Sequence, residues 1–256
     1  QNSYQVSTSS VGNFTIAFGA NPYDPTNFST DFDSLLVRWS DADNPFEWVP
    51  STTNQSGENR LSYGSYIVAA IDTRQEILIW TDAAIFSMQY LGPPYVFSQN
   101  LLMDNISIAS PNSPITVNNV TYWMGVDKFY QYTGRVETLP CSLRQYVFND
   151  INTDQLSQIV AGTNEGFNEV WWFYPSANSI VNDRYVIYNH LERIWYYGNL
   201  ERSYWLDSPL RQFPMAAFSY QQSYLSADID SSVTIIPVIN SASYPNTGVV
   251  TLNLPN

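Results

Sequence analysis

Two pairs of closely spaced carboxylates are the residues best suited to chemistry. Asp41 with Asp43, and Asp228 with Asp230, have the residue types of a glycosidase acid and base, which must stand a few ångströms apart across a sugar. Both pairs lie in turn-like segments rich in serine and asparagine, where an aspartate usually bonds to nearby backbone. We therefore interpret both pairs as turn residues.

The chain has one histidine, His190, and one cysteine, Cys141. One cysteine excludes an internal disulfide, and one histidine excludes any site that needs two imidazoles. His190 follows a predicted strand as a loop residue, and no Gly-x-Ser-x-Gly elbow accompanies it, which argues against a Ser-His-Asp arrangement. Cys141 stands at a predicted helix start, which favours a thiolate, but it lacks a reactive partner, so we interpret it as a packing residue. The sequence predicts no catalytic residue, cofactor site or metal site.

The composition favours an all-β protein that does not bind nucleic acid tightly. Tyrosine (19), phenylalanine (13) and tryptophan (8) are abundant, whereas charged residues make up only 13% of the 256 residues, a balance typical of strands. The formal net charge is −13, and no cluster of Lys or Arg is present. Such a chain repels polyanions. Tight DNA binding is therefore not expected, but a surface that conducts DNA without holding it would have this charge.

A tryptophan that closes a strand and precedes a turn recurs along the chain. Trp39, Trp80, Trp123 and Trp172 follow one another at intervals of 41, 43 and 49 residues. A four-stranded propeller blade repeats at roughly 40 to 50 residues. The sequence therefore predicts a propeller-like arrangement of antiparallel four-stranded blades.

Alternating or continuous apolar runs predict the strands of these blades. A strand is expected near Phe14 to Phe18, and the further predicted strands are residues 35–39, 66–71, 76–80, 85–90, 115–117, 120–124, 128–132, 135–139, 169–174, 184–189, 194–197, 233–239 and 249–254. Residues 52–64 are expected to be a surface loop. Asn118 and Asn119 predict a two-residue hairpin turn, because asparagine tolerates the positive φ angles that such turns require.

One helical insertion is expected within 141–159. Leu143, Tyr146 and Val147 fall on one face of a first short helix, and Asn152 begins a segment that can cap a second. We expect three regions: an irregular strand and loop over 1–34, a propeller-like domain over 35–215, and additional strands over 216–256. The chain begins without Met and ends just after a predicted strand, so we expect a portion of a longer subunit.

An ordered series of motifs resembles the tail nozzle proteins of short-tailed bacteriophages, also called tail tubular protein B or packaged-DNA stabilisation proteins, especially those of phages from marine hosts. The resemblance runs from about residue 35 to residue 215. The motifs are Arg38-Trp39-Ser40-Asp41, Ile79-Trp80-Thr81-Asp82, Met88-Gln89-Tyr90-Leu91-Gly92-Pro93-Pro94, Tyr122-Trp123-Met124-Gly125, Leu139-Pro140-Cys141, Tyr146-Val147-Phe148-Asn149-Asp150-Ile151-Asn152, Asn168-Glu169-Val170-Trp171-Trp172-Phe173-Tyr174 and Arg184-Tyr185-Val186-Ile187-Tyr188-Asn189.

The resemblance implies a structural protein of the virion, located in the phage tail and without enzymatic activity. It implies a hexamer of identical subunits in a six-fold ring, contacts with other tail proteins such as an adaptor and fibres, and a channel that retains and releases genomic DNA without sequence-specific binding. Six acidic surfaces around one axis would let a polyanion slide. No transmembrane helix is expected, because no run of about 18 apolar residues occurs.

A different class of function stays open. The rows of tryptophan and tyrosine could stack sugars, as in a carbohydrate-binding or carbohydrate-cleaving β-propeller that recognises a host surface glycan. Their strand spacing favours packing in the core and between blades. An exposed, co-facial aromatic pair beside two close carboxylates would favour the glycan hypothesis, whereas acidic residues lining a six-fold axis would favour the nozzle. A third hypothesis is a cell-surface β module of unknown ligand.

Overall fold

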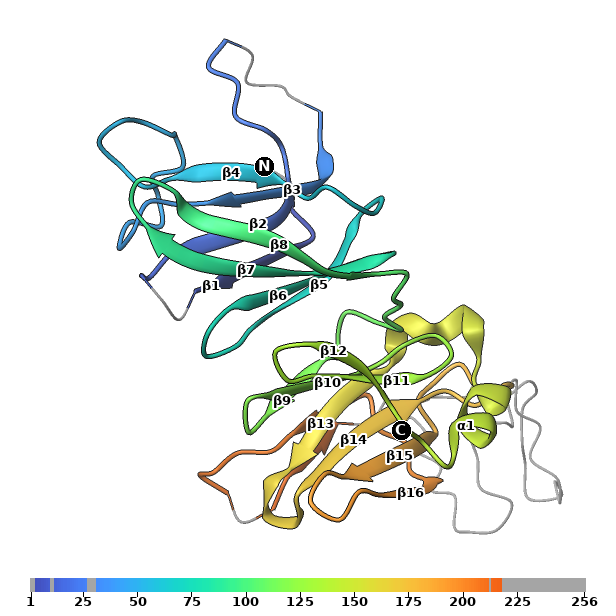
Figure 1. Ribbon diagram of the computed structural model, residues 1–256. Helices are drawn as coiled ribbons and strands as arrows, with labels where there is room; N and C mark the ends of the chain where they lie inside the picture. Colours follow the sequence, from blue (N-terminus) through green and yellow to red (C-terminus); the bar gives the residue numbers. More distant parts are fainter. Residues whose placement is uncertain (1–2, 10–11, 27–30, 212, 218–256) are drawn as a thin grey trace, which may run out of the picture. The chain divides into compact units, whose positions relative to one another are not determined.

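The computed structural model describes residues 3–9, 12–26, 31–211 and 213–217. Their strands form four antiparallel sheets of four strands and one of two strands. Figure 1 labels the strands of the four larger sheets. The prediction of an all-β fold is therefore confirmed. The predicted strands 233–239 and 249–254, and the pair Asp228 and Asp230, lie outside the described residues.

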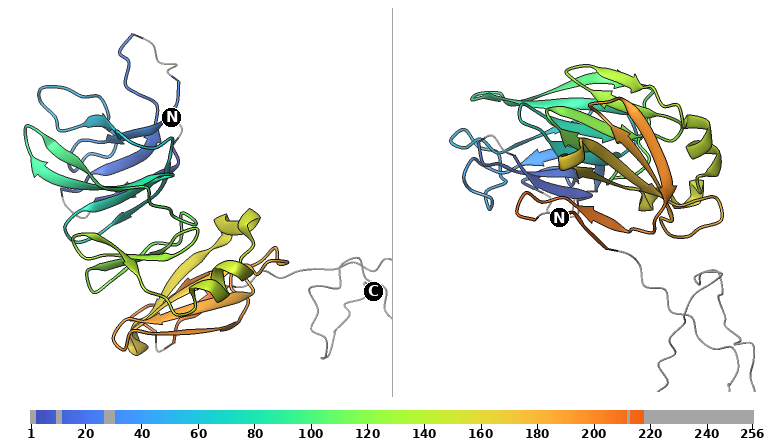
Figure 2. Two further views of the ribbon diagram at one scale, coloured as in Figure 1. Left: turned by 45° about the vertical axis from the view of Figure 1, so that its right-hand side comes forward. Right: turned by 90° about the horizontal axis from the view of Figure 1, so that it is seen from below.

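Each four-stranded sheet is a meander in which neighbours in sequence are neighbours in space (Figures 1 and 2). Sheet 1 contains β1 (Gln5–Thr8), β2 (Thr15–Ala20), β3 (Asp33–Trp39) and β4 (Gly57–Arg60). Sheet 2 contains β5 (Ile67–Asp72), β6 (Ile77–Thr81), β7 (Ala84–Gly92) and β8 (Val96–Asp104). Sheet 3 contains β9 (Ile115–Val117), β10 (Val120–Met124), β11 (Phe129–Tyr132) and β12 (Val136–Leu139). Sheet 4 contains β13 (Val160–Asn164), β14 (Glu169–Tyr174), β15 (Arg184–Asn189) and β16 (Ile194–Asn199), and sheet 5 contains β17 (Tyr204–Leu206) and β18 (Met215–Ala217).

Successive sheets share hydrophobic cores through alternate residues of the same strand. On β6, Ile77 and Ile79 join a cluster that contains Ile16 of sheet 1. Trp80 points to the opposite face of β6 and joins a second cluster with Trp123 of sheet 3. Sheet 2 therefore buries both of its faces, which explains why all five residues of β6 are buried.

Sheets 3 and 4 share a third core by the same alternation. Tyr122 and Met124 of β10 lie on the face opposite Trp123 and join a cluster with Trp172 of β14. Val147 of the helical insertion belongs to the same cluster. Sheets 2 and 3 thus each contribute to two cores, one shared with the preceding sheet and one with the following sheet. Whether the sheets close radially about one axis stays a prediction.

The helical insertion lies between sheets 3 and 4 in the sequence. It contains α1 (Arg144–Asp150) and the 3₁₀ helix η1 (Thr153–Gln158), and a second 3₁₀ turn, η2 (Glu165–Phe167), follows β13. The Asn152 side chain accepts a hydrogen bond from the Asp154 N–H at 3.1 Å, so the predicted cap is confirmed. The predicted apolar face is only partly right, because Val147 is buried whereas Tyr146 is 42% exposed.

The predicted hairpin of sheet 3 has the expected turn. Asn118 and Asn119 adopt φ angles of 51° and 64°, the left-handed values of a type I′ turn. β9 and β10 pair through Val117 and Val120 on either side of it. Local turn chemistry therefore sets the register of this hairpin.

Several expectations about the strands are wrong. The segment 52–64, expected to be a loop, contains β4, and the predictions omitted β1, β8, β13, β17 and β18. Trp39 ends the third strand of its sheet, whereas Trp80, Trp123 and Trp172 lie on second strands. The interval of 41 residues between Trp39 and Trp80 therefore joins a third strand to a second strand. It is not the repeat length of one sheet, because the two tryptophans do not occupy equivalent strands.

Candidate functional site

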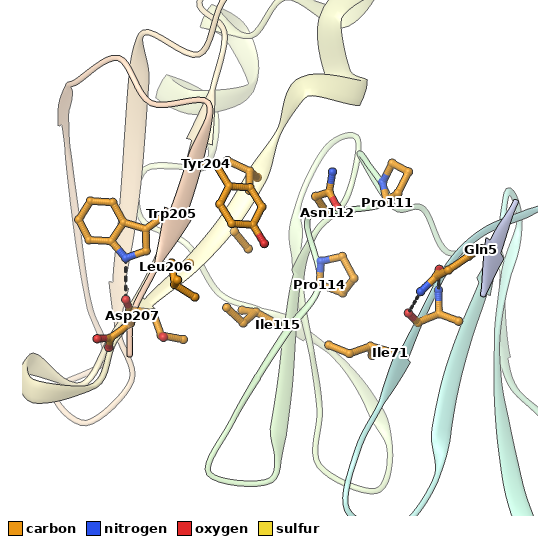
Figure 3. Close-up of a pocket in the computed structure, with 15 residues that line it drawn as sticks. Gln5, Ile71, Pro111, Asn112, Pro114, Ile115, Tyr204, Trp205, Leu206 and Asp207 are labelled. Carbon is orange, nitrogen blue, oxygen red and sulfur yellow. Dashed lines mark hydrogen bonds between the residues drawn. The ribbon is translucent and has the colours of Figure 1, made fainter. Parts of the chain in front are cut away.

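The first strands of all five sheets line one cavity of about 370 Å³ (Figure 3). Gln5 comes from β1, Ile71 from β5 and Ile115 from β9. The remaining lining residues are Ala70, Pro111, Asn112, Pro114, Val160, Ala161, Gly162, Thr163, Tyr204, Trp205, Leu206 and Asp207. This convergence makes the cavity the main candidate site among the described residues.

Hydrogen bonds outside the sheets join neighbouring walls of the cavity. The Gln5 side chain donates from Nε2 to the Ala70 carbonyl at 2.8 Å and accepts from the Ala70 N–H at 2.9 Å. Its amide thus bonds to β5 as a peptide group would. Between sheets 3 and 4, the Ala161 N–H donates to the Asn112 carbonyl at 2.8 Å. One side-chain amide and one backbone hydrogen bond therefore hold the walls of the cavity together.

Sheet 5 packs on sheet 4 through Trp205. Its indole N–H donates to the Thr163 carbonyl at 2.7 Å, and its ring stacks on Trp171 at 5.0 Å with planes inclined by 13°. Gly162 leaves the space for this ring, since a Cβ at that position would collide with Trp205. Trp205 is therefore a structural residue of the cavity wall.

The cavity is poor in charge. Asp207 is the single carboxylate among its lining residues, and its Oδ2 accepts a hydrogen bond from the Glu165 N–H at 2.7 Å. No lysine, arginine or histidine is among the lining residues. The volume falls in the range of small-molecule pockets, about 300–1,000 Å³. A cavity of this size is too narrow for a DNA double helix, whose major groove alone is about 12 Å wide.

The structure places the predicted carboxylates Asp41 and Asp43 in loop contacts. Asp41 Oδ1 accepts a hydrogen bond from the Gln55 N–H at 2.7 Å, and Asp43 Oδ1 accepts one from Asn13 Nδ2 at 2.6 Å. Asp43 has a φ of 57°, a turn conformation. Both carboxylates thus bind distant segments of sheet 1 rather than their own turn.

His190 and Cys141 are both partly buried. The His190 ring stacks on Tyr122 at 6.4 Å, and burial lowers its pKa. Burial also raises the pKa of the Cys141 thiol to about 11, so the expected thiolate-favouring position is wrong. The physical reason is that α1 begins only at Arg144, while the Cys141 side chain packs against the core shared by sheets 3 and 4.

The described part of the chain contains neither a candidate metal site nor a candidate membrane-spanning helix. Within those ranges, no group of three or more His, Cys, Asp or Glu residues could hold a metal ion. No helix among the same residues is long and apolar enough to cross a membrane.

Most tryptophans serve packing. Trp80, Trp123 and Trp172 have no exposed surface. An exposed aromatic pair does occur: Tyr146 and Tyr197 are 42% and 51% exposed, with ring centroids 4.4 Å apart. Their planes are inclined by 49°, so the pair is not co-facial.

The sequence predictions missed the residues that line the cavity. Gln5 and Asn112 stand in polar segments with no strong strand pattern, and their roles depend on contacts with distant strands. Trp205 was the one lining residue with a recognisable signal, because an isolated tryptophan after the fourth sheet indicates a further packed element. Comparison with known proteins adds no assignment, because neither a protein-family model nor a curated protein matches the chain.

Proposed function

We propose that the chain is a structural subunit of a bacteriophage tail nozzle, which assembles in the virion as a ring and acts without catalysis. The series of motifs from residue 35 to residue 215 supports this proposal by its resemblance to that family. The observation that carries it is the succession of four-stranded sheets that share cores with their neighbours. Such a continuous series of packed sheets suits the wall of a ring.

The sheets are arranged as propeller blades in this proposal. First strands from all five sheets line one cavity, and β13 contacts both β9 and β17. In a β-propeller, four-stranded sheets repeat radially around a central channel. Sheet 5 would then be the start of a fifth blade.

The DNA conduit lies between subunits in this proposal, because the cavity is too small for a duplex. A chain with a net charge of −13 gives a ring of six subunits a strongly acidic surface. DNA phosphates meet few lysine or arginine side chains on such a surface. Few counterions are therefore released from the DNA, so the release contributes little to binding. The genome would pass without sequence-specific contacts, while an adaptor and fibres attach elsewhere on the ring.

Imaging of the purified protein with its tail partners tests the proposal. We expect a six-fold ring in projection and a hexamer by native mass spectrometry. We also expect no retention of duplex DNA at low salt, where electrostatic binding is strongest. A stable monomer that binds glycans would contradict the proposal.

A carbohydrate-binding or carbohydrate-cleaving propeller is the alternative. The exposed pair Tyr146 and Tyr197 is the described feature nearest to a sugar-stacking surface, but its rings are tilted rather than co-facial. Asp150 lies four residues after Tyr146 on α1, on the same side of the helix. However, Arg184 Nε lies 3.5 Å from the Asp150 carboxylate and 3.9 Å from that of Asp183. These carboxylates are engaged with a cation. Loss of glycan binding in Tyr197→Ala, at unchanged melting temperature, would support the alternative.

A further inference from the structure

The fourth strand of each four-stranded sheet is an edge. β4, β8, β12 and β16 each pair with one strand only among the described residues. An edge strand presents unpaired N–H and C=O groups, which can add a strand from another chain. Proteins often block such edges with charged side chains or proline.

Two of these edges carry charges. β4 contains Glu58 and Arg60 within four residues. β12 contains Glu137, which forms an ion pair with Arg135 at 2.6 Å. Charges on a short edge disfavour pairing with another strand.

The other two edges lack such charges and prolines, and β8 has one irregularity, a register shift between Leu101 and Met103 in its pairing with β7. The residues of β8 from Val96 to Met103 include no charge and no proline, and β16 includes neither along its whole length. Exposed apolar side chains accompany both strands: Leu101 is 46% exposed and Tyr196 is 43% exposed. In a chain with a net charge of −13, these are two neutral surfaces through which copies can approach.

The ends of the two strands are complementary in charge. β8 ends at Asp104, and Arg193 immediately precedes β16. Both residues are exposed, and neither takes part in an ion pair with another described residue. In an antiparallel ladder, the end of one strand faces the start of the other.

We propose that β8 of one copy pairs antiparallel with β16 of a second copy, so that Asp104 faces Arg193 of the partner subunit. Within one chain the two strands belong to sheets 2 and 4, and sheet 3 shares a core with each of these. The pairing joins different surfaces, so each added copy leaves one β8 and one β16 free, and the series can close as a ring. This inference deepens the proposed function and rests on it.

The overlap is long enough for a stable ladder. The six residues of β16 span about 20 Å when extended. Backbone hydrogen bonds supply affinity in such strand addition, and the flanking side chains supply specificity.

Charge reversal in the full-length chain tests the pairing. We expect Asp104→Arg and Arg193→Asp each to raise the dissociation constant of the assembly at least about tenfold, because each places like charges opposite one another. The double variant restores the opposite-charge pair and should recover assembly. Asp154→Arg is the control for net charge, since Asp154 is exposed on η1.

A second pair of variants tests the edges themselves. Leu101→Lys places a charge on β8 and should weaken assembly, whereas Thr138→Lys, at an exposed position on β12, should not. Sedimentation velocity and native mass spectrometry measure assembly, and circular dichroism checks the fold of each variant.

The results of these experiments distinguish the proposed β8–β16 pairing from the proposed six-fold nozzle. A six-fold ring that tolerates all these substitutions overturns the pairing and leaves the nozzle proposal standing. An assembly that responds to the substitutions as expected but is not six-fold supports the pairing and contradicts the nozzle. A wild-type protein that stays monomeric, or stops at a dimer, overturns both.

Discussion

The indole of Trp80 meets the indole of Trp123 edge to face, with ring centroids 5.3 Å apart and planes inclined by 71°. Both rings are fully buried, and they occupy the next-to-last position of the second strand in successive sheets. Trp123 also stacks on Tyr130 at 5.2 Å. The contact between sheets 2 and 3 is therefore built from aromatic rings at repeating positions.

The two indole N–H groups differ, which gives a matched comparison. Trp123 Nε1 donates to the Ser107 carbonyl at 3.2 Å, whereas Trp80 Nε1 has no acceptor among the described residues. We expect Trp80→Phe to be less destabilising than Trp123→Phe by about 1 kcal/mol, because it removes an unsatisfied donor rather than a hydrogen bond. Urea unfolding measures both free energies. Equal losses would contradict the assigned difference.

A carboxylate joins the same two sheets. The Tyr132 hydroxyl donates to Glu76 Oε1 at 2.5 Å, while Gln89 donates to Oε2 at 3.1 Å. We expect Tyr132→Phe to lower the free energy of unfolding by about 1.5–3 kcal/mol at pH 7, the range for a hydrogen bond to a charged group. Denaturant unfolding measures the loss, and an unchanged midpoint would exclude the bond as a stabilising contact.

The effect of the same substitution depends on pH in alkali. Burial and the hydrogen bond to Glu76 raise the pKa of the Tyr132 hydroxyl above the ordinary value of 10.0. The native state therefore holds this proton more tightly than the unfolded state, and stability falls as pH rises above about 10. Burial raises the pKa of Tyr122 to about 12, so Tyr132→Phe should reduce this pH dependence without abolishing it. Identical slopes above about pH 10 in the two proteins would contradict the assignment.

Gly162 and Gly166 form a matched pair for testing how sheet 5 is attached. A Cβ at Gly162 would collide with the Trp205 ring, whereas a Cβ at Gly166 would meet nothing within 4 Å. We expect Gly162→Ala to displace Trp205 and to increase hydrogen exchange in β17 and β18. Gly166→Ala should leave exchange there unchanged. Equal exchange in both variants would show that Trp205 does not hold sheet 5.

Local pattern predicted much of sheets 2, 3 and 4. Three examples are the Asn118-Asn119 turn, the continuous apolar run of β6 and the strand–turn–strand pattern of β14 to β16. The conformation of each follows from its own residues. Such elements have either a specific turn chemistry or burial on both faces. They are recognisable without knowledge of their neighbours.

The missed elements depend on distant partners. β4 has the polar sequence Gly-Glu-Asn-Arg, and it is a strand because it pairs with residues 36 to 39 of β3. The cavity is likewise assembled from short first strands of five sheets. No local period signals such a site, because its residues come together only when the sheets pack.

Trp172 tests whether the aromatic rows serve packing or recognition. The side chain is fully buried, and its Nε1 donates to the Ser113 carbonyl at 3.0 Å. We expect Trp172→Ala to destabilise the fold by about 3–5 kcal/mol, the range for truncating a large buried ring. Unchanged thermal melting together with lost ligand binding would identify it as a recognition residue.

Arg38 holds the long connection of sheet 1 against β3. Its side chain is only 2% exposed and lies 3.2 Å from the Glu58 carboxylate. Its guanidinium donates to the carbonyls of Asn21 at 3.1 Å and Trp48 at 2.8 Å. Burial lowers the pKa of Arg38, and Glu58 opposes this effect.

Removing only one charge of this pair should cost more than removing both. We expect Glu58→Gln to leave a buried guanidinium without its counterion, a change that costs about 3–5 kcal/mol when both charges are fully buried. Because the Glu58 side chain is 28% exposed, solvent screens the pair and the loss of unfolding free energy should lie at or below the lower end of that range. The double variant Arg38→Met with Glu58→Gln removes the buried charge and keeps an apolar chain of similar length, so it should be more stable than Glu58→Gln alone. Unfolding free energies from urea denaturation give the comparison. A double variant less stable than Glu58→Gln would show that the two carbonyl bonds of Arg38, rather than its pairing with Glu58, dominate its contribution.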